Sequence, residues 1–583
     1  SHFGSYFAFR KCTTDVACLN KIMGWFLVTT LVSIICSAAA ADVPHTVREH
    51  RPNILFVQPD QWRWDWAGFD APSVRLPMLA RLSTEGTRFT HAYVASAFCT
   101  PSRVAFAAGC MYDESPVQDN GIDYPVDSGP ETVYALLQAA GYTTMLAGKD
   151  HLSAKSGIGV DGSIHAKELG FDAWVRTGDK YENFNQTFPH EQYGALLATM
   201  PLPDNRSGAR SAYDIQAACY GPLGGGNCCE EFPREETQGG FFCPRTSPVD
   251  DIYSIDQWTE QQAEKLLLKH WGNSEVGEGL KDRKAAADFN PKKDAWFLQV
   301  GFPSPHPPFI MDRLMNASSA GRDYPPAKDL QGSVDPETVL ASRREYGALV
   351  ESLDALLGRL LRFINDTRPA DFANMVIIVT SDHGEMLGDH GHYGKMVPWD
   401  GSTRVPLVIS GPGIEQHRVI DEPVAIADLA ATILEIAGTS PGPQMTSRSL
   451  WPFLAGLTSA TPRSVVLSGL NVTRGKGSSK QVWDWRLAVK RYNASTVLKL
   501  VCCPRGCPAA GSLLRHSTAP QAALLKIGAE GDIENVLGET PGQGVAEARE
   551  LLAELPAAYQ GQCRGVIGNP ASGVLEGWPL RDK

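Results

Sequence analysis

Polar residues follow four strand-like apolar runs, and their types suit the binding of a cation together with an anion. Asp60 and Gln61 follow the run 53–58, Lys149, Asp150 and His151 follow 143–147, His306 comes after 295–300, and Asp382 and His383 follow 375–380. Ligands of an open α/β sheet bind at the carboxyl ends of its strands, so we expect these groups to face one pocket. Carboxylates, imidazoles and ammonium groups together suit a hard cation and an anionic substrate.

Each of these groups also has a plainer interpretation when it is taken alone. A single Asp-His pair is more often a hydrogen-bonded loop than a metal site, and a lone lysine is usually a solvated surface group. Asp389, His390 and His392 lie beside the same loop, and we assign them to structure or to the rim of the pocket.

The segment Cys99-Thr100-Pro101-Ser102-Arg103 adds a candidate nucleophile. A helix is expected to begin just after Cys99, which places the thiol at the positive end of the helix dipole and Arg103 one turn on. An anion or oxyanion would be stabilised there. On spacing alone, a buried or disulfide-bonded structural cysteine explains Cys99 equally well.

The elements that would position these residues form an α/β pattern. Short β-rich apolar runs at 53–58, 143–147, 295–300, 375–380 and 406–410 alternate with longer helical patterns. This alternation predicts a sheet that is buried on both faces. Asp335-Pro336 begins a helix whose leucines, from Leu349 to Leu361, recur at spacings of three and four residues and should pack on the sheet.

The pattern changes along the chain in a way that predicts three parts. Residues 1–41 form the first part, a main domain spans 48–460, and a smaller C-terminal α+β subdomain spans 461–583. Within the main domain, residues 200–250 are rich in cysteine and glycine and are interpreted as an inserted loop at the rim of the pocket.

The first part has the features of a secretory signal peptide. Lys21 precedes an uncharged stretch from Met23 to Ala41 that has an apolar centre and ends in small residues. Residues 1–22 would then be an upstream extension, and the alternative is an uncleaved membrane anchor. Cleavage predicts a secreted protein or one in the lumen of the secretory pathway. N-x-S/T sequons agree with that route and begin at Asn185, Asn205, Asn316, Asn365, Asn471 and Asn493.

The 13 cysteines support the same compartment. Beyond the first part, four gather at Cys219, Cys228, Cys229 and Cys243, and four more at Cys502, Cys503, Cys507 and Cys563. We interpret the two groups as local disulfide clusters with Cys110 as a buried thiol. A metal site is the alternative for Cys502, Cys503 and Cys507, but no histidine lies nearby at ligand spacing. The net charge of −12 offers no basic face for phosphates, so nucleic acid is not an expected partner.

The order of the motifs resembles that of the formylglycine-dependent sulfatases, within the alkaline-phosphatase-like superfamily. Their hallmark is C-x-P-S-R, which Cys99 to Arg103 match fully. The other motifs stand in the family's order over residues 51–415: R-P-N-I-L-F, G-K-D-H-L, H-P-P-F and S-D-H-G-E-M-L-G-D-H-G-H-Y-G-K. The resemblance implies a large, mostly parallel central sheet flanked by helices, followed by a small C-terminal subdomain.

The resemblance also implies an activity: the hydrolysis of sulfate esters to alcohol and inorganic sulfate. A formylglycine-generating enzyme would oxidise Cys99 during maturation, and the hydrated aldehyde would attack sulfur and later release the sulfate. The implied cofactor is a divalent cation, Ca²⁺ before Mn²⁺ or Mg²⁺. Its implied ligands are Asp60, Gln61, residue 99, Asp382 and His383.

Roles for the other polar residues follow from the same resemblance. Arg103 would brace the nucleophile, and Lys149 and Lys395 would neutralise the sulfate oxygens. His151 would take a proton during sulfate release, and His306 would protonate the leaving alcohol, although a turn-forming role for His306 is the alternative.

Three positions depart from the usual family pattern. Pro59 gives the P-D-Q form of a branch that also contains choline sulfatases and phosphonate or phosphate esterases, so a phosphate or phosphonate ester hydrolase is an alternative. Asp150 stands where an aromatic residue is common, which would weaken the binding of a second anion. Cys110 stands where arginine usually closes the signature.

A second alternative to sulfate-ester hydrolysis is a catalytically silent secreted binding protein. This alternative predicts the loss of pocket residues.

Overall fold

The computed structural model describes residues 51–69, 73–152, 166–178, 245–246, 254–272, 295–474 (with breaks at 312, 329, 331–335, 458–459 and 462), 481–504, 521–528, 531–535, 545–557, 559–560 and 563. The predicted signal segment at 1–41, the predicted insertion at 200–250 and its four cysteines lie outside the described residues.

A mixed sheet forms the centre of the main part. Its strands, in spatial order, are β10 (Arg418–Ile420), β2 (Gly86–Tyr93), β9 (Arg404–Ser410), β8 (Met375–Val379), β1 (Asn53–Val57), β6 (Trp296–Gly301), β3 (Thr143–Gly148) and β4 (Ala173–Arg176), and β11 (Val424–Ala425) also pairs with β2. Both pairs that include β9 are antiparallel, and the other pairs are parallel. The predicted mostly parallel sheet is confirmed, as are the five strand-like runs.

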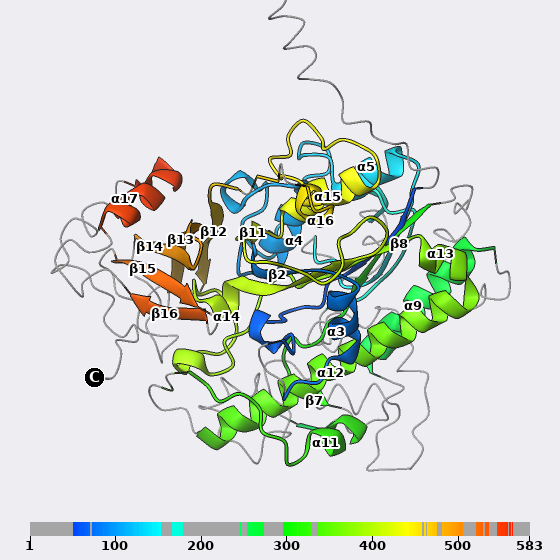
Figure 1. Cartoon of the computed structure of the whole chain (residues 1–583), viewed down its shortest axis with the longest axis horizontal. Helices are drawn as coiled ribbons and strands as arrows, with labels where there is room; N and C mark the ends of the chain where they lie inside the picture. The colour runs from blue at the N-terminus through cyan, green and yellow to red at the C-terminus, as the bar shows by residue number, and fades with distance from the viewer. Residues whose placement is uncertain are drawn as a thin grey trace, which may run out of the picture. The chain divides into compact units, whose positions relative to one another are not determined.

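Helices cover both faces of this sheet (Figure 1). One group is α4 (Cys99–Ala108), α5 (Val133–Ala139), α15 (Asp428–Ile436) and α16 (Trp451–Leu454), and the other is α3 (Pro77–Thr84), α9 (Ile255–His270), α11 (Arg313–Ser319), α12 (Pro336–Thr367) and α13 (Pro369–Ala373). Alternate residues of β1 enter opposite cores: Ile54 and Phe56 lie in one, Leu55 and Val57 in the other. This explains why the strand reads as a continuous apolar run.

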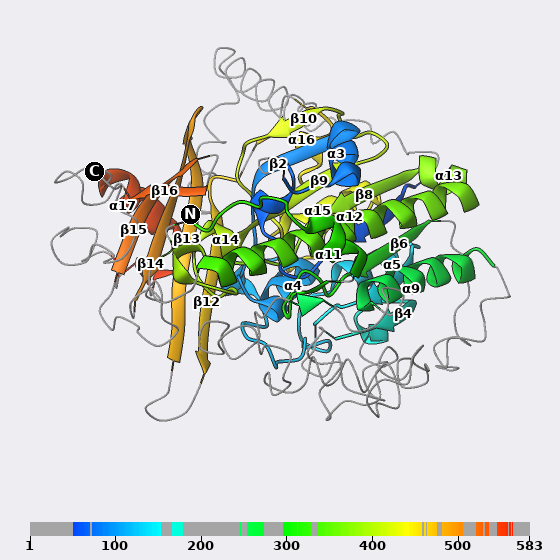
Figure 2. The ribbon, with the colours of Figure 1, turned by 90° about the horizontal axis from the view of Figure 1, so that it is seen from below.

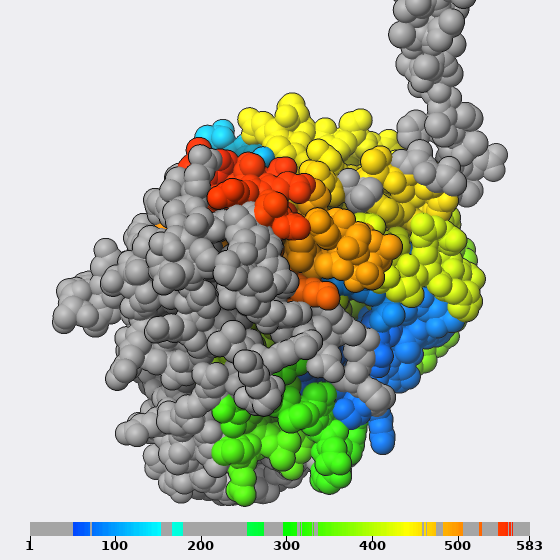
Figure 3. All heavy atoms as spheres, turned by 60° about the vertical axis from the view of Figure 1, so that its left-hand side comes forward, coloured from blue at the N-terminus to red at the C-terminus, as the bar shows by residue number. Residues whose placement is uncertain are grey.

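A second, antiparallel sheet lies beside the main part (Figure 2). Its strands, in order, are β12 (Val466–Arg474), β13 (Gln481–Asn493), β14 (Thr496–Cys503), β15 (Gln521–Gly528) and β16 (Gly531–Asn535). One face contacts α17 (Val545–Glu554), and the other shares a hydrophobic core with the main part. In the space-filling view, the C-terminal residues in orange and red lie directly against yellow residues of the main part (Figure 3).

Short elements complete the described fold: α14 (Asp400–Thr403), the 3-10 turns η1 (Trp64–Trp66), η2 (Tyr112–Glu114) and η8 (Asp389–Gly391), and a small sheet of β5 (Arg245–Thr246) and β7 (Ile310–Met311). Cys502 is bonded to Cys563, as the predicted C-terminal cluster allows, and among the described cysteines Cys99 and Cys110 carry free thiols. No helix in the described part of the chain is long and apolar enough to span a membrane.

Candidate active site

The candidate site lies at the carboxyl ends of β1, β3, β6 and β8, which are neighbouring parallel strands. Asp60 follows β1, Lys149 and His151 follow β3, His306 follows β6, and Asp382 and His383 follow β8. Parallel strands end at one edge of a sheet, so these side chains meet although they are far apart in sequence. One ligand atom from each of Asp60, Cys99, Asp382 and His383 lies within 4.8 Å of the others, and all four residues are buried.

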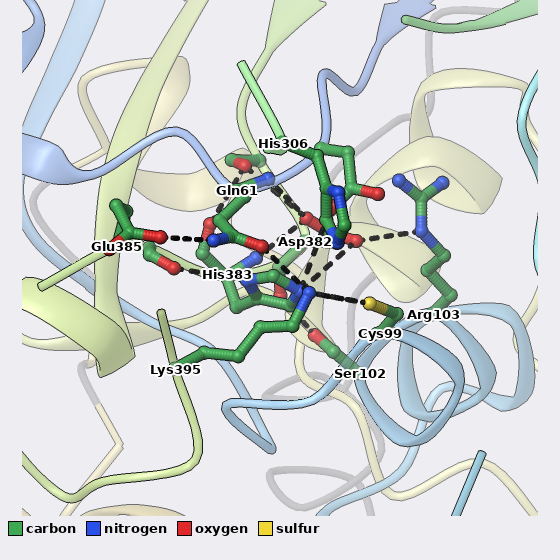
Figure 4. A network of polar contacts seen from close by, with 12 residues as sticks. Gln61, Cys99, Ser102, Arg103, His306, Asp382, His383, Glu385 and Lys395 are labelled. Atoms are coloured by element: carbon green, nitrogen blue, oxygen red, sulfur yellow. Dashed lines mark hydrogen bonds and ion pairs between the residues drawn. The ribbon is translucent and has the colours of Figure 1, made fainter. Parts of the chain in front are cut away.

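Cys99 is the first residue of α4, and the extended Phe98 is its N-cap. The Cys99 sulfur lies 3.2 Å from His383 Nε2 and 3.0 Å from Lys395 Nζ (Figure 4). The helix ends at Gly109, which has a φ of 59° and therefore turns the chain away. The thiol thus faces the polar cluster from a helix N-terminus, and it is not bonded to another cysteine.

Two opposing effects set the ionisation of Cys99. Burial alone would raise the pKa of the thiol, because a charged sulfur would lose its hydration. The ammonium groups of Lys395 and Lys149 and the imidazole of His383 outweigh burial and the repulsion from Asp60, so the pKa lies well below its usual value. Negative charge at position 99 is therefore stabilised.

Arg103 lies one turn along α4 and is 1% exposed. Its Nε donates to Asp382 Oδ2 at 2.8 Å, and its Nη1 donates to the Lys149 backbone oxygen at 3.1 Å and to Gln58 Oε1 at 3.3 Å. These contacts hold the carboxylate of Asp382 and the end of β3. The structure thus ties Arg103 to the cluster through Asp382.

The two lysines contact different members of the cluster. Lys149 pairs with Asp60 Oδ2, and both side chains are almost fully buried. Lys395 donates to Gln61 Oε1 at 2.7 Å and to the Cys99 sulfur. Burial would raise the pKa of Asp60, but Lys149, followed by His306, Lys395 and His383, lowers it well below its usual value. Asp60 is therefore ionised.

The donor set fits a divalent cation. Asp60 Oδ1 is buried and has no hydrogen-bond partner, although His383 Nε2 lies 3.5 Å from it. His383 Nδ1 lies 3.1 Å from the Gly384 carbonyl, which only accepts, so Nδ1 donates there and Nε2 is the ring nitrogen that faces Asp60 and Cys99. Two carboxylates and a correctly oriented imidazole are suitable ligands for Ca²⁺, Mn²⁺ or Mg²⁺.

Gln61 lies beside this set in a left-handed conformation with a φ of 73°. Its amide nitrogen donates to Glu385 Oε2, and its amide oxygen accepts from Lys395. Glu385 Oε1 in turn accepts backbone N–H groups of Leu387 at 2.9 Å and of Gly394 at 2.5 Å. Glu385 was not singled out from the sequence, although it belongs to the S-D-H-G-E motif.

His151 and Asp150 are held by an arginine that the sequence analysis also missed. Arg176, at the end of β4, contacts both carboxylate oxygens of Asp150 at 2.7 Å. Asp150 Oδ1 also accepts the backbone N–H of His151 at 2.8 Å, and His151 has a φ of 50°. The negative charge of Asp150 was expected to weaken the binding of a second anion. Arg176 compensates that charge.

His306 is 5% exposed, and one of its ring nitrogens contacts a backbone carbonyl. Its Nδ1 lies 2.7 Å from the carbonyl of Pro307, an acceptor only, so Nδ1 donates. Nε2 is consequently the atom that remains for acid-base chemistry. Figure 4 draws His306 among the side chains of this polar network, and its ring interacts electrostatically with Asp60.

The residues assigned to structure or rim make structural contacts. Asp389 lies between Arg63 at 2.7 Å and Arg343 at 3.0 Å, which hold the pKa of its carboxyl below the usual range against the effect of burial. His390 stacks on Trp399 with ring centroids 4.1 Å apart. None of the described metal-ligand clusters includes these residues.

Comparison with known proteins is consistent with this geometry. The Sulfatase family model matches residues 52–439. A choline-sulfatase of Rhizobium meliloti is 26% identical over 67% of this chain and 68% of the relative, and an arylsulfatase of Clostridium perfringens is 23% identical over 67% and 76%. The solved phosphonate monoester hydrolase of Silicibacter pomeroyi has a TM-score of 0.59 at 20% identity, covering 86% of this chain and 94% of that chain.

A putative sulfatase from Bacteroides thetaiotaomicron has a TM-score of 0.52 at 17% identity, over 88% of this chain and 94% of that chain. At these identities the two solved structures establish the fold, whereas the family model spans most of the described main part and carries the assignment. The chain therefore belongs to the sulfatase family and is a sulfuric ester hydrolase.

Proposed function

We propose that the chain hydrolyses sulfate esters through a nucleophile made at position 99 by oxidation of Cys99 to formylglycine. The observation that carries this proposal is the position of Cys99 at the start of α4, where its sulfur contacts His383 and Lys395 within the buried cluster. Hydrated formylglycine supplies a hydroxyl that attacks sulfur and a second one that allows the sulfate to leave.

Asp60, Asp382, His383 and residue 99 would hold a divalent cation, with the Gln61 oxygen as a further donor. A bound cation supplies Lewis-acid polarisation of a sulfate oxygen. Asp60 Oδ1, which is buried without a hydrogen-bond partner, supports this assignment. The oxygen-rich set favours Ca²⁺, and His383 keeps Mn²⁺ and Mg²⁺ as alternatives.

The other polar side chains bind the ester and move protons. Lys395, which contacts the Cys99 sulfur, and Lys149, which pairs with Asp60, would neutralise sulfate oxygens as charge accumulates on them. His306 would give a proton from Nε2 to the leaving alcohol oxygen, while its Nδ1 stays bonded to Pro307. His151 would take the proton that is released when sulfate leaves.

Maturation in the secretory pathway, by a formylglycine-generating enzyme, belongs to the same proposal. The Cys502–Cys563 disulfide supports an oxidising compartment. The sequon residues Asn365, Asn471 and Asn493 are exposed. Expression through a secretory host should yield protein whose mass falls on enzymatic removal of N-glycans, and an unchanged mass would contradict this route.

Phosphate or phosphonate ester hydrolysis is the second candidate, favoured by the P-D-Q form that Pro59 gives to the first motif and by the fold shared with a phosphonate monoester hydrolase. Rates on an aryl sulfate and on an aryl phosphodiester separate the two. We expect a preference for the sulfate, abolition by Cys99→Ala, and retention in Cys110→Ala, which changes the other described free thiol. A large preference for the phosphodiester would reject sulfate-ester hydrolysis as the main activity.

A further inference from the structure

The C-terminal sheet contacts the loop that carries Lys395. Met396, the next residue, has a left-handed backbone with a φ of 76°. Its N–H donates to the Ala97 carbonyl at 3.1 Å, and its own carbonyl accepts from Trp485 Nε1 at 2.9 Å. Non-glycine residues adopt such a φ only where surrounding contacts enforce it. The two hydrogen bonds on Met396 are contacts of this kind.

Trp485 is in β13, is fully buried and forms part of the core shared by the second sheet and the main part. That core includes Ala97 and Phe98, which precede the nucleophile, and Val397 and Trp399, which follow Lys395. The indole thus shares one core with the chain segments that carry the two reacting groups, and its N–H donates to the segment that carries Lys395.

Neighbouring strands hold the same two segments. In β12, the N–H of Gly469 donates to the Ala95 carbonyl at 3.0 Å. In β14, Lys499 Nζ forms a buried ion pair with Asp400 Oδ1 at 2.8 Å. The second sheet therefore contacts both flanks of the site, and Trp485 is its contact nearest in sequence to Lys395.

We propose that Trp485 is a positioning residue for Lys395: its indole N–H fixes the Met396 peptide so that the Lys395 ammonium reaches the nucleophile. The inference rests on the proposed role of Lys395 in neutralising sulfate. It assigns the second sheet a part in catalysis, since the loop conformation depends on a residue that lies far along the chain.

Trp485→Phe keeps an aromatic ring in the core and removes the N–H donor. We expect it to lower kcat on an aryl sulfate by about tenfold with a smaller change in KM, since one hydrogen bond is lost and the ammonium is misplaced. In a Lys395→Ala background the same substitution should change kcat by less than about twofold, because residues that act as a unit are not additive. Rates are normalised to the formylglycine content of each protein.

Leu487→Ala is the matched control, since Leu487 lies in the same strand and core but makes no side-chain hydrogen bond to the loop. It should lower the melting temperature and leave kcat within about twofold, because only packing is lost. Met396→Gly provides a rescue variant: glycine adopts the left-handed φ without strain and keeps the backbone N–H and carbonyl, so it should leave kcat within about twofold alone and restore part of the kcat lost in Trp485→Phe.

An equal fold loss of kcat from Trp485→Phe in the wild-type and Lys395→Ala backgrounds would overturn the positioning role alone. A loss of kcat in Leu487→Ala as large as that in Trp485→Phe would do the same. Wild-type kcat in Lys395→Ala would overturn the proposed role of Lys395 and the inference with it. If Trp485→Phe does not fold, Trp485→Met, which also removes the N–H donor, takes its place in both backgrounds and in the Met396→Gly rescue.

Discussion

His306 offers a test of proton transfer that is separate from binding. Its Nδ1 is engaged with Pro307, so Nε2 is the atom that would protonate the leaving oxygen. We expect His306→Asn to slow the hydrolysis of an alkyl sulfate by about 10²–10⁴-fold and that of a 4-nitrophenyl sulfate much less, since nitrophenolate leaves without a proton. Steady-state rates on the two esters measure this. Equal losses on both would favour the alternative role of His306 as a turn residue.

His383 offers a test of the cation. Its Nε2 faces Asp60 and the Cys99 sulfur, while Nδ1 is bonded to the Gly384 carbonyl. We expect chelation to abolish activity and His383→Asn to shift the restoring ion toward Ca²⁺, since it replaces nitrogen with oxygen. Activity after titration with each ion gives the preference. Full activity in metal-free protein would contradict a metal site here.

The positions of the candidate residues were predictable because each follows a strand or belongs to a short motif. Asp60, Asp382 and His383 follow apolar runs that are buried on both faces, which makes the strand ends easy to recognise. Arg176 and Trp485 act through contacts that join distant segments, and a single sequence carries no signal for such pairings, whereas Glu385 stands within the S-D-H-G-E motif. The charge compensation of Asp150 by Arg176 is an example.

At the scale of elements, left-handed residues gather in the loops that follow the central strands. Gln61, His151, Leu387, His390 and Met396 all have positive φ without being glycine. Such conformations persist where surrounding contacts determine them, and they occur preferentially at functional sites. The sequence did not predict them, nor strand β2, whose half-buried residues alternate irregularly with buried ones.

Helix α12 carries a buried carboxyl group that costs stability. Glu345 is 3% exposed, and its Oε2 has no hydrogen-bond partner. Burial raises its pKa from 4.5 to about 7, against the partial effect of Arg344. An unfolded chain therefore releases this proton at lower pH than the folded protein does, so stability falls as the pH rises from 4.5 toward 7.

Glu345→Gln should remove this penalty. We expect an increase in the free energy of unfolding at pH 8 of at most about 3 kcal/mol and little change at pH 4, where the carboxyl is protonated in both states. Urea denaturation at the two pH values measures both. A variant that is less stable than wild type at pH 8 would show that the ion pair with Arg344 outweighs the cost of burial.

At the scale of the whole molecule, the two sheets share one core, in which Tyr93, Ala97 and Met386 meet Leu470 and Trp485. A chain that ends at residue 460 would expose this apolar surface and lose the contacts to the Lys395 loop. We expect such a protein to aggregate or to be inactive, as measured by size-exclusion chromatography and aryl sulfate turnover. A soluble monomer with the wild-type rate would show that the second sheet is dispensable.

The central claim is that Cys99 becomes the nucleophile. Mass spectrometry of the peptide that contains Cys99, from protein made in a secretory pathway, tests it most directly. We predict an aldehyde in which oxygen has replaced the thiol sulfur with loss of two hydrogens, in a fraction that scales with activity across preparations. Unmodified Cys99 thiol in protein that is fully active on sulfate esters would contradict the mechanism.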